Sequence, residues 1–131
     1  MRELMLPVSP GEAIDKLTIL AIKEARIDDA GKLSHVRHER ALLQAAIAAE
    51  VPQDETLARL STELATINEA LWQIEDDIRA RDAAGDFGAR FVALARAVYV
   101  TNDRRAAVKK AINQHLGSAL VEEKSYAGHG G

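Results

Sequence analysis

The chain contains no cysteine, and this absence excludes disulfide bonds, thiolate catalysis and cysteine-based zinc sites. Aromatic residues make up only 4% of the 131 residues, whereas alanine and leucine abound, which favours helices over a β-sandwich core. No apolar run approaches the length of a membrane span, and the start of the chain lacks an apolar signal core. We therefore expect a cytoplasmic protein without membrane insertion.

The chain also lacks a large excess of positive or negative charge. The formal net charge is −3 at pH 7, and the cationic residues are scattered among acidic ones. Such a surface has no positive field that would attract a phosphate backbone, so we expect no nucleic-acid partner. Hydrophobic residues make up 47% of the chain, which is ordinary for a globular protein. We expect a single helical domain over residues 1–127 and a disordered tail over residues 128–131.

One apolar row organises the chain. Its members are separated by alternating three- and four-residue steps, and a mean step of about 3.5 residues is typical of a seam where one helix packs on another. Burying such side chains is worth about 1.5–3 kcal/mol each, which a lone helix cannot gain. The row therefore predicts a long helix over about residues 54–84 with partner helices beside it. Its members are Leu57, Leu60, Leu64, Ile67, Leu71, Ile74 and Ile78.

Capping signals predict the first two helices. Ser9 and Glu12 have the spacing of a capping box, and Pro10 stands at the first helical position, where its missing N–H is not needed. We expect a nearly all-apolar helix from Pro10 to residue 26 or 27. A second helix is expected over about residues 32–50.

The last helix, expected over about residues 87–116 with Asp86 as its cap, carries an interrupted apolar row. The row passes through two polar residues, Thr101 and Arg105. Either the helix breaks at residues 102–103, which are good caps, or one long helix has polar residues on its buried face. We expect one continuous helix.

These elements predict an all-α fold. A short turn at Gly85 makes the two long helices antiparallel neighbours. The predicted architecture is an antiparallel bundle of four or five helices, dominated by a hairpin of about residues 54–84 and 87–116. The first helix packs centrally, the second lies across it, and the polar interruption of the last helix faces the middle of the apolar row.

Charged, amide and aromatic side chains gather on this hairpin and on the first helix. Some share a face beside the seam, and others are cations whose heads must reach water or a partner. Arginine forks, ammonium groups and carboxylates suit a pocket for an anionic metabolite, on which an aromatic ring could stack. The candidate ligand-binding residues are Lys16, Lys23, Arg26, Trp72, Glu75, Arg79, Tyr99, Asn102, Asp103, Arg105 and Lys109.

The same residues also fit a structural role, as interhelical ion pairs that set the register of the hairpin. This interpretation is favoured, because structural ion-pair networks imitate binding sites. Arg105 is the main support for a pocket, since an arginine in an apolar row costs stability unless an anion meets it. Asp15, in the apolar first helix, needs a partner for the same reason. The sequence indicates no catalytic residue, no metal site and no cofactor.

Three segments carry a family resemblance: PVSPGEAIDKLTILAIKEARI, LWQIEDDIR and FVALARAVYVTNDRRAAVKKAINQHLGSALVEEKSY. They resemble a family of small uncharacterised bacterial proteins classed as a domain of unknown function. The likeness spans nearly the whole chain and is weakest over the second helix and the linker after it. It implies one compact domain and transfers no activity.

Two functions remain open. The first is a non-catalytic interaction or ligand-binding module, which self-associates, binds a protein partner through its helices or is accessory to a larger enzyme. This interpretation is based on the part of the long apolar row that should stay exposed. It is also based on the absence of any catalytic motif in the sequence. The alternative is an enzyme or sensor for an anionic metabolite, such as a nucleotide or phosphosugar. Its anion would be bound by Lys16, Lys23, Arg105 and Lys109, with Glu75 or Asp103 for Mg²⁺ or proton transfer.

Overall fold

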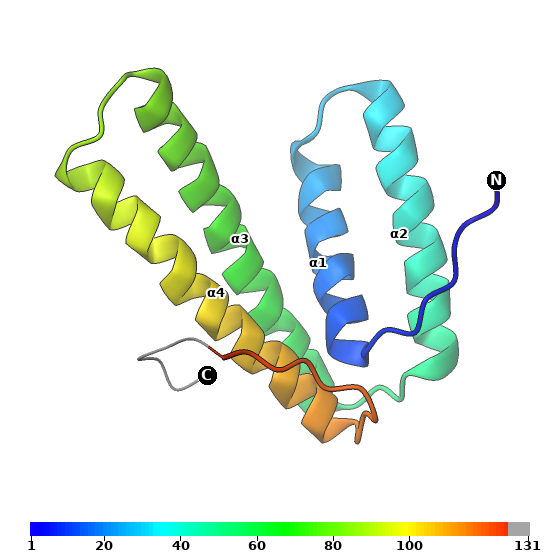
Figure 1. The fold of residues 1–131 in the computed structure, drawn as a ribbon. Coiled ribbons are helices and arrows are strands. Elements are labelled where there is room, and N and C mark those ends of the chain that lie inside the picture. Colours follow the sequence, from blue (N-terminus) through cyan, green and yellow to red (C-terminus); the bar gives the residue numbers. More distant parts are fainter. Residues whose placement is uncertain (126–131) are drawn as a thin grey trace.

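The computed structural model describes residues 1–125, which form four helices arranged as two antiparallel hairpins (Figure 1). The first hairpin consists of α1, Pro10–Arg26, and α2, Ala30–Glu50. The second consists of α3, Glu55–Ala83, and α4, Ala89–His115. The described residues contain no strand. The prediction of an all-α bundle dominated by a long hairpin is confirmed.

Local capping explains where the first two helices begin. The Ser9 hydroxyl accepts a hydrogen bond from the Glu12 N–H at 3.1 Å, as the capping box predicts. α2 begins at Ala30, two residues before the predicted start. The reason is Asp29, whose carboxylate accepts a hydrogen bond from the Lys32 N–H at 2.8 Å and so caps an earlier turn.

The turn between α3 and α4 differs from the prediction at Asp86. Its carboxylate accepts a hydrogen bond from the Gly88 N–H at 3.1 Å and pairs with Arg81, so it braces the turn instead of capping the helix. α4 therefore begins at Ala89, two residues later than predicted. Gly85 has φ +67°, the left-handed conformation that glycine adopts most easily and that the predicted helix end requires.

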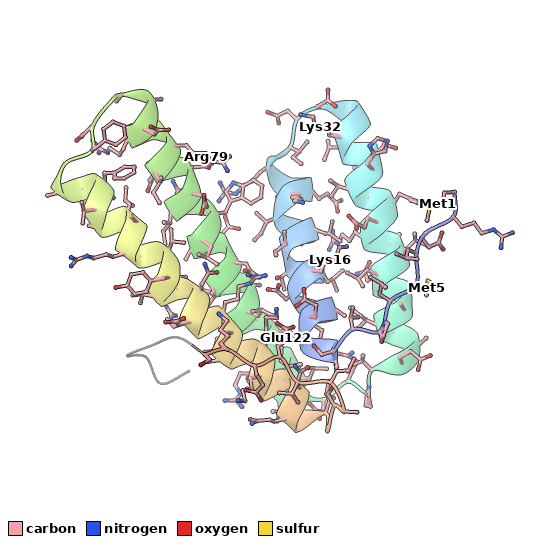
Figure 2. The ribbon with its side chains drawn as sticks, in the orientation of Figure 1. Met1, Met5, Lys16, Lys32, Arg79 and Glu122 are labelled. Atoms are coloured by element: carbon pink, nitrogen blue, oxygen red, sulfur yellow. The ribbon has the colours of Figure 1, made fainter. Side chains whose placement is uncertain are left out.

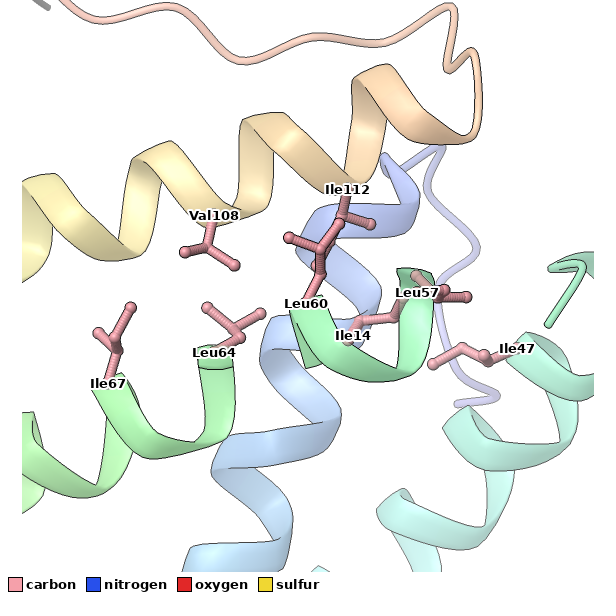
Figure 3. Packing of buried hydrophobic residues seen from close by; sticks show 8 residues of the cluster. All are labelled: Ile14, Ile47, Leu57, Leu60, Leu64, Ile67, Val108 and Ile112. Atoms are coloured by element: carbon pink, nitrogen blue, oxygen red, sulfur yellow. The ribbon is translucent and has the colours of Figure 1, made fainter. Parts of the chain in front are cut away.

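α1 is the central helix. Its backbone lies close to those of α2, α3 and α4, whereas the backbone of α2 lies close only to that of α1 among the described helices. α2 runs antiparallel beside α1, so the predicted crossing is wrong: the short link between them makes a hairpin (Figure 1). The main core cluster draws on all four helices and consists of Ile14, Ile47, Leu57, Leu60, Leu64, Ile67, Val108 and Ile112 (Figure 3).

The long seam of α3 is buried over only part of its length. Residues 57–67 of the row are at most 9% exposed, but Leu71, Ile74 and Ile78 are only partly buried. The lengths explain this difference, since the 17 residues of α1 span about 25 Å and the 29 residues of α3 about 43 Å. The hairpins also diverge towards this end (Figure 1). Residues 71–100, here named the distal hairpin, thus form a two-helix projection.

Both ends of the described chain are extended. Residues 1–8 are exposed, and Met1 and Met5 lie outside α2 (Figure 2). After Gly117, which has φ +63°, residues 118–125 run back along α4 (Figure 1). The predicted disordered tail, residues 128–131, lies outside the described residues. No described helix is long and apolar enough to cross a membrane.

The contact between the first turn of α1 and α4 predicts an intolerant glycine. The Gly11 N–H donates to the Asn113 side-chain oxygen at 2.7 Å, and a Cβ at Gly11 would lie 2.5 Å from the Lys109 carbonyl oxygen. Gly11→Ala should therefore lower the free energy of unfolding, measured with urea, by about 1–3 kcal/mol.

Gly31→Ala is the matched control. It lies in the first turn of α2, where a Cβ would meet its nearest atom at 3.4 Å, so alanine should leave stability unchanged or raise it by up to about 1 kcal/mol. Equal effects of the two substitutions would contradict the close packing of α1 on α4.

Candidate functional site

A buried carboxylate joins three helices. Asp15 of α1 has a side chain that is only 1% exposed. Arg105 of α4 grips it with two groups, Nε donating to Oδ1 at 2.8 Å and Nη2 donating to Oδ2. Asn68 of α3 donates from Nδ2 to the same Oδ1 at 2.9 Å. A bidentate arginine and a further hydrogen bond offset the cost of removing the carboxylate from water.

Thr18 completes the surroundings of Asn68. The Thr18 hydroxyl, one turn after Asp15, accepts from Asn68 Nδ2 at 2.7 Å and donates to the Asp15 carbonyl oxygen at 2.7 Å. The amide of Asn68 is thus held by two oxygens of α1. The residue follows Ile67 of the apolar seam, so the seam itself brings this polar group against α1.

Lys109, one turn after Arg105, binds a second carboxylate of α1. Its Nζ lies 2.5 Å from Glu12 Oε2, 4.0 Å from Asp15 Oδ2 and 3.4 Å from the Glu122 carboxylate. Glu122 belongs to the extended segment after α4 and lies near the first turn of α1 (Figure 2). Residues Glu12, Asp15, Thr18, Asn68, Arg105, Lys109 and Glu122 are named the Asp15 network below.

The electrostatics of the Asp15 network follow from these contacts. Hydrogen bonding to Lys109 lowers the pKa of Glu12 from its usual value. Hydrogen bonding to Asp15 raises the pKa of Arg105, which stays charged throughout the ordinary pH range. The network contains three carboxylates and two cations, so its formal charge is already negative. A site with this balance gains little by accepting another anion.

The remaining predicted site residues are dispersed. Lys16 pairs with Glu39 of α2 at 2.8 Å and lies between α1 and α2 (Figure 2). Arg26 pairs with Glu69 of α3, and its guanidinium carbon lies 5.8 Å from the centroid of the Trp72 ring, a cation–π arrangement. These contacts tie α1 to α2 and to α3.

The other predicted residues lie outside the Asp15 network. Glu75, Arg79, Tyr99 and Asp103 are exposed on α3 and α4, and Lys23 and Asn102 are partly buried. Of the eleven predicted residues, the structure thus brings only Arg105 and Lys109 into one polar cluster. That the eleven residues share a ligand pocket stays a prediction.

Sequence reasoning missed most partners in the Asp15 network. It recognised that Asp15 and Arg105 each needed a partner, but it did not pair them, because their 90-residue separation includes two whole helices and three connecting segments. The contact between Gly11 of α1 and Asn113 of α4 could not be predicted, because neither residue belongs to a sequence pattern that indicates it. Among residues 1–125, no three histidine or carboxylate side chains are grouped so that they could hold a metal ion.

Fold and network together define a class: an all-α protein of two helical hairpins joined by a buried carboxylate and its cationic partners. Residues 4–129 match a family described as a family of unknown function, DUF6165, and the chain belongs to this family. The resemblance seen in the sequence is thereby confirmed. Neither the curated proteins nor the solved structures contain a match.

Removal of Arg105 alone should be costly. Arg105→Met leaves Asp15 as a buried charge whose nearest remaining cation, Lys109, is 4.0 Å away, and we expect a loss of about 3–5 kcal/mol in the free energy of unfolding. The double variant Asp15→Leu/Arg105→Met removes both charges and should lose less than the single variant. Urea denaturation followed by circular dichroism measures both. A single variant as stable as the wild type would contradict a stabilising ion pair.

Glu12 should contribute an acid-sensitive part of the stability. Because its pKa is lower in the folded state than the usual 4.5, its contribution is complete above that value and is lost as the pH falls through the folded-state pKa. The difference in unfolding free energy between the wild type and Glu12→Gln should therefore shrink when the pH is lowered from 7 to below 4. A difference that stays constant over this pH range would contradict the ion pair between Glu12 and Lys109.

Proposed function

We propose that this chain is a non-catalytic interaction module that binds a protein partner through the distal hairpin, residues 71–100. The proposal includes the cytoplasmic location expected from the sequence. The observation that supports the protein-binding surface is the placement of the aromatic residues.

Within residues 1–125, no aromatic side chain belongs to the main core cluster. The chain has one tryptophan, two phenylalanines and two tyrosines, and the main core cluster contains only leucine, isoleucine and valine. Four of these five residues lie in the distal hairpin: Trp72, Phe87, Phe91 and Tyr99. Aromatic side chains bury large areas at little entropic cost, so they are enriched at the energetic centres of protein interfaces.

Two of these rings are exposed and two are partly buried. Phe87 is 57% exposed and Tyr99 is 50% exposed, and Val92 and Val100 of α4 are also exposed. Phe87 meets Phe91 edge to face, with ring centroids 5.2 Å apart, so the tip of the hairpin presents a preformed aromatic pair. An apolar surface on a projecting element favours a protein partner, which would remove this surface from water.

The alternative, a site for an anionic metabolite, loses its main motive. That motive was an arginine in an apolar row without an anion. Arg105 has its anion in Asp15, and the cluster around it already carries more carboxylates than cations. We therefore propose the interaction module alone.

Site-specific photocrosslinking in cells tests the module. A benzophenone-bearing phenylalanine analogue at Phe87 replaces one exposed aromatic ring by another, and the same analogue at His38 places the probe on the exposed face of α2. We expect one discrete protein adduct from position 87 and none from position 38. Mass spectrometry identifies the crosslinked peptide. Absence of an adduct at position 87, or identical adducts at both positions, would overturn the proposed surface.

A further inference from the structure

One side of the α3–α4 hairpin is covered by α1 near the core and uncovered beyond it. On α3 this side is marked by Asn68, whose amide binds Asp15 and Thr18 of α1. On α4 it is marked by Arg105, which binds Asp15. The side chains that continue this side along each helix can be found from the helical repeat.

On α3 the continuation consists of Trp72, Glu75 and Arg79, which follow Asn68 at steps of four, three and four residues. Figure 2 shows Arg79 directed from α3 towards the side on which α1 lies. Trp72 stands at the boundary, because its ring is in contact with Arg26 in the last turn of α1.

On α4 the continuation consists of Val98 and Phe91, which precede Arg105 at seven-residue steps. Both are only partly buried, as is Trp72, although each is a large apolar residue. The five residues Trp72, Glu75, Arg79, Phe91 and Val98 are named the distal face. α1 ends at Arg26, whose guanidinium lies against the Trp72 ring at the boundary of the distal face. Beyond that boundary, Glu75 and Arg79 are exposed, and Phe91 and Val98 are only partly buried.

The charges of the distal face are self-complementary. Glu75 and Arg79 are exposed, opposite in sign and one helical turn apart. When α3 meets a second α3 in antiparallel orientation about a two-fold axis near residue 77, Glu75 of each copy faces Arg79 of the other. A two-fold interface repeats every contact with the two copies exchanged. One acidic and one basic residue, a helical turn apart on the same helix, therefore form two ion pairs between the copies.

We propose that the partner of the distal face is a second copy of this chain, and this inference rests on the proposed interaction module. Two distal hairpins then pack as an intermolecular four-helix bundle, with Trp72, Phe91 and Val98 at its centre and the two Glu75–Arg79 pairs at its edge. The second copy then covers the α3–α4 hairpin beyond the end of α1, just as α1 covers the part nearer the core.

Charge reversal tests this dimer in the purified full chain by light scattering across a dilution series. Glu75→Arg places arginines opposite arginines, and Arg79→Glu places glutamates opposite glutamates. Each single variant should raise the dimer dissociation constant at least about tenfold at low ionic strength. The double variant Glu75→Arg/Arg79→Glu should return to the wild-type value, because the reversed pattern is again self-complementary.

Mixing makes the test specific. The two single variants, each weakened alone, should associate with each other, because arginines at positions 75 and 79 then face glutamates. The matched controls are Arg59→Glu and Glu63→Arg, which reverse an exposed pair at the same spacing on the part of α3 nearer the core and should leave the dissociation constant unchanged. Circular dichroism checks that all variants are folded.

The outcomes separate this inference from the proposed function. A wild-type chain that is monomeric at high concentration, or a dimer that Glu75→Arg and Arg79→Glu leave unchanged, overturns the second copy as the partner of the distal face. If the Phe87 crosslink then joins a different protein, the interaction module stands without the dimer. If position 87 yields no adduct either, both proposals fall.

Discussion

The architecture depends on the buried carboxylate of Asp15. A carboxylate this far from water is tolerated only when cationic and amide donors surround it, and those donors come from two other helices, Arg105 of α4 and Asn68 of α3. Apolar packing alone would tolerate a shift of α1 along the hairpin by a turn. The buried ion pair does not, because such a shift would separate the charges. Asp15 thereby sets the position of α1.

This position divides the long hairpin into two parts with different roles. Where α1 lies, the seam is covered and its leucine and isoleucine side chains are buried. Beyond α1 the seam continues without this cover, and four of the five aromatic residues of the chain are found there. The division explains how a small helical domain with a well-packed core also presents an apolar surface. A short central helix and a long hairpin are sufficient for both.

Several features could be predicted from particular residues. The spacing of Leu57, Leu60, Leu64 and Ile67 predicted the buried seam, and Ser9 and Gly85 marked a helix start and a helix end, because these signals act over a few residues. Asp86 was misassigned, since a carboxylate before a helix can bind either the helix N–H groups or the turn itself. For Arg105 the pattern predicted the need for an anion, but the position of the anion was beyond any local rule.

The sequence by itself determined the helices, their approximate ends and the existence of one long apolar seam, because hydrogen bonding, capping and helical periodicity operate within a few residues. The tertiary structure decided how the hairpins are arranged, which charges meet and where the seam loses its cover. Asp15 and Arg105 are 90 residues apart, and only the packing of α1 against α3 and α4 brings them within hydrogen-bonding distance. Burial then makes their pairing a requirement, since a carboxylate away from water needs a positive partner.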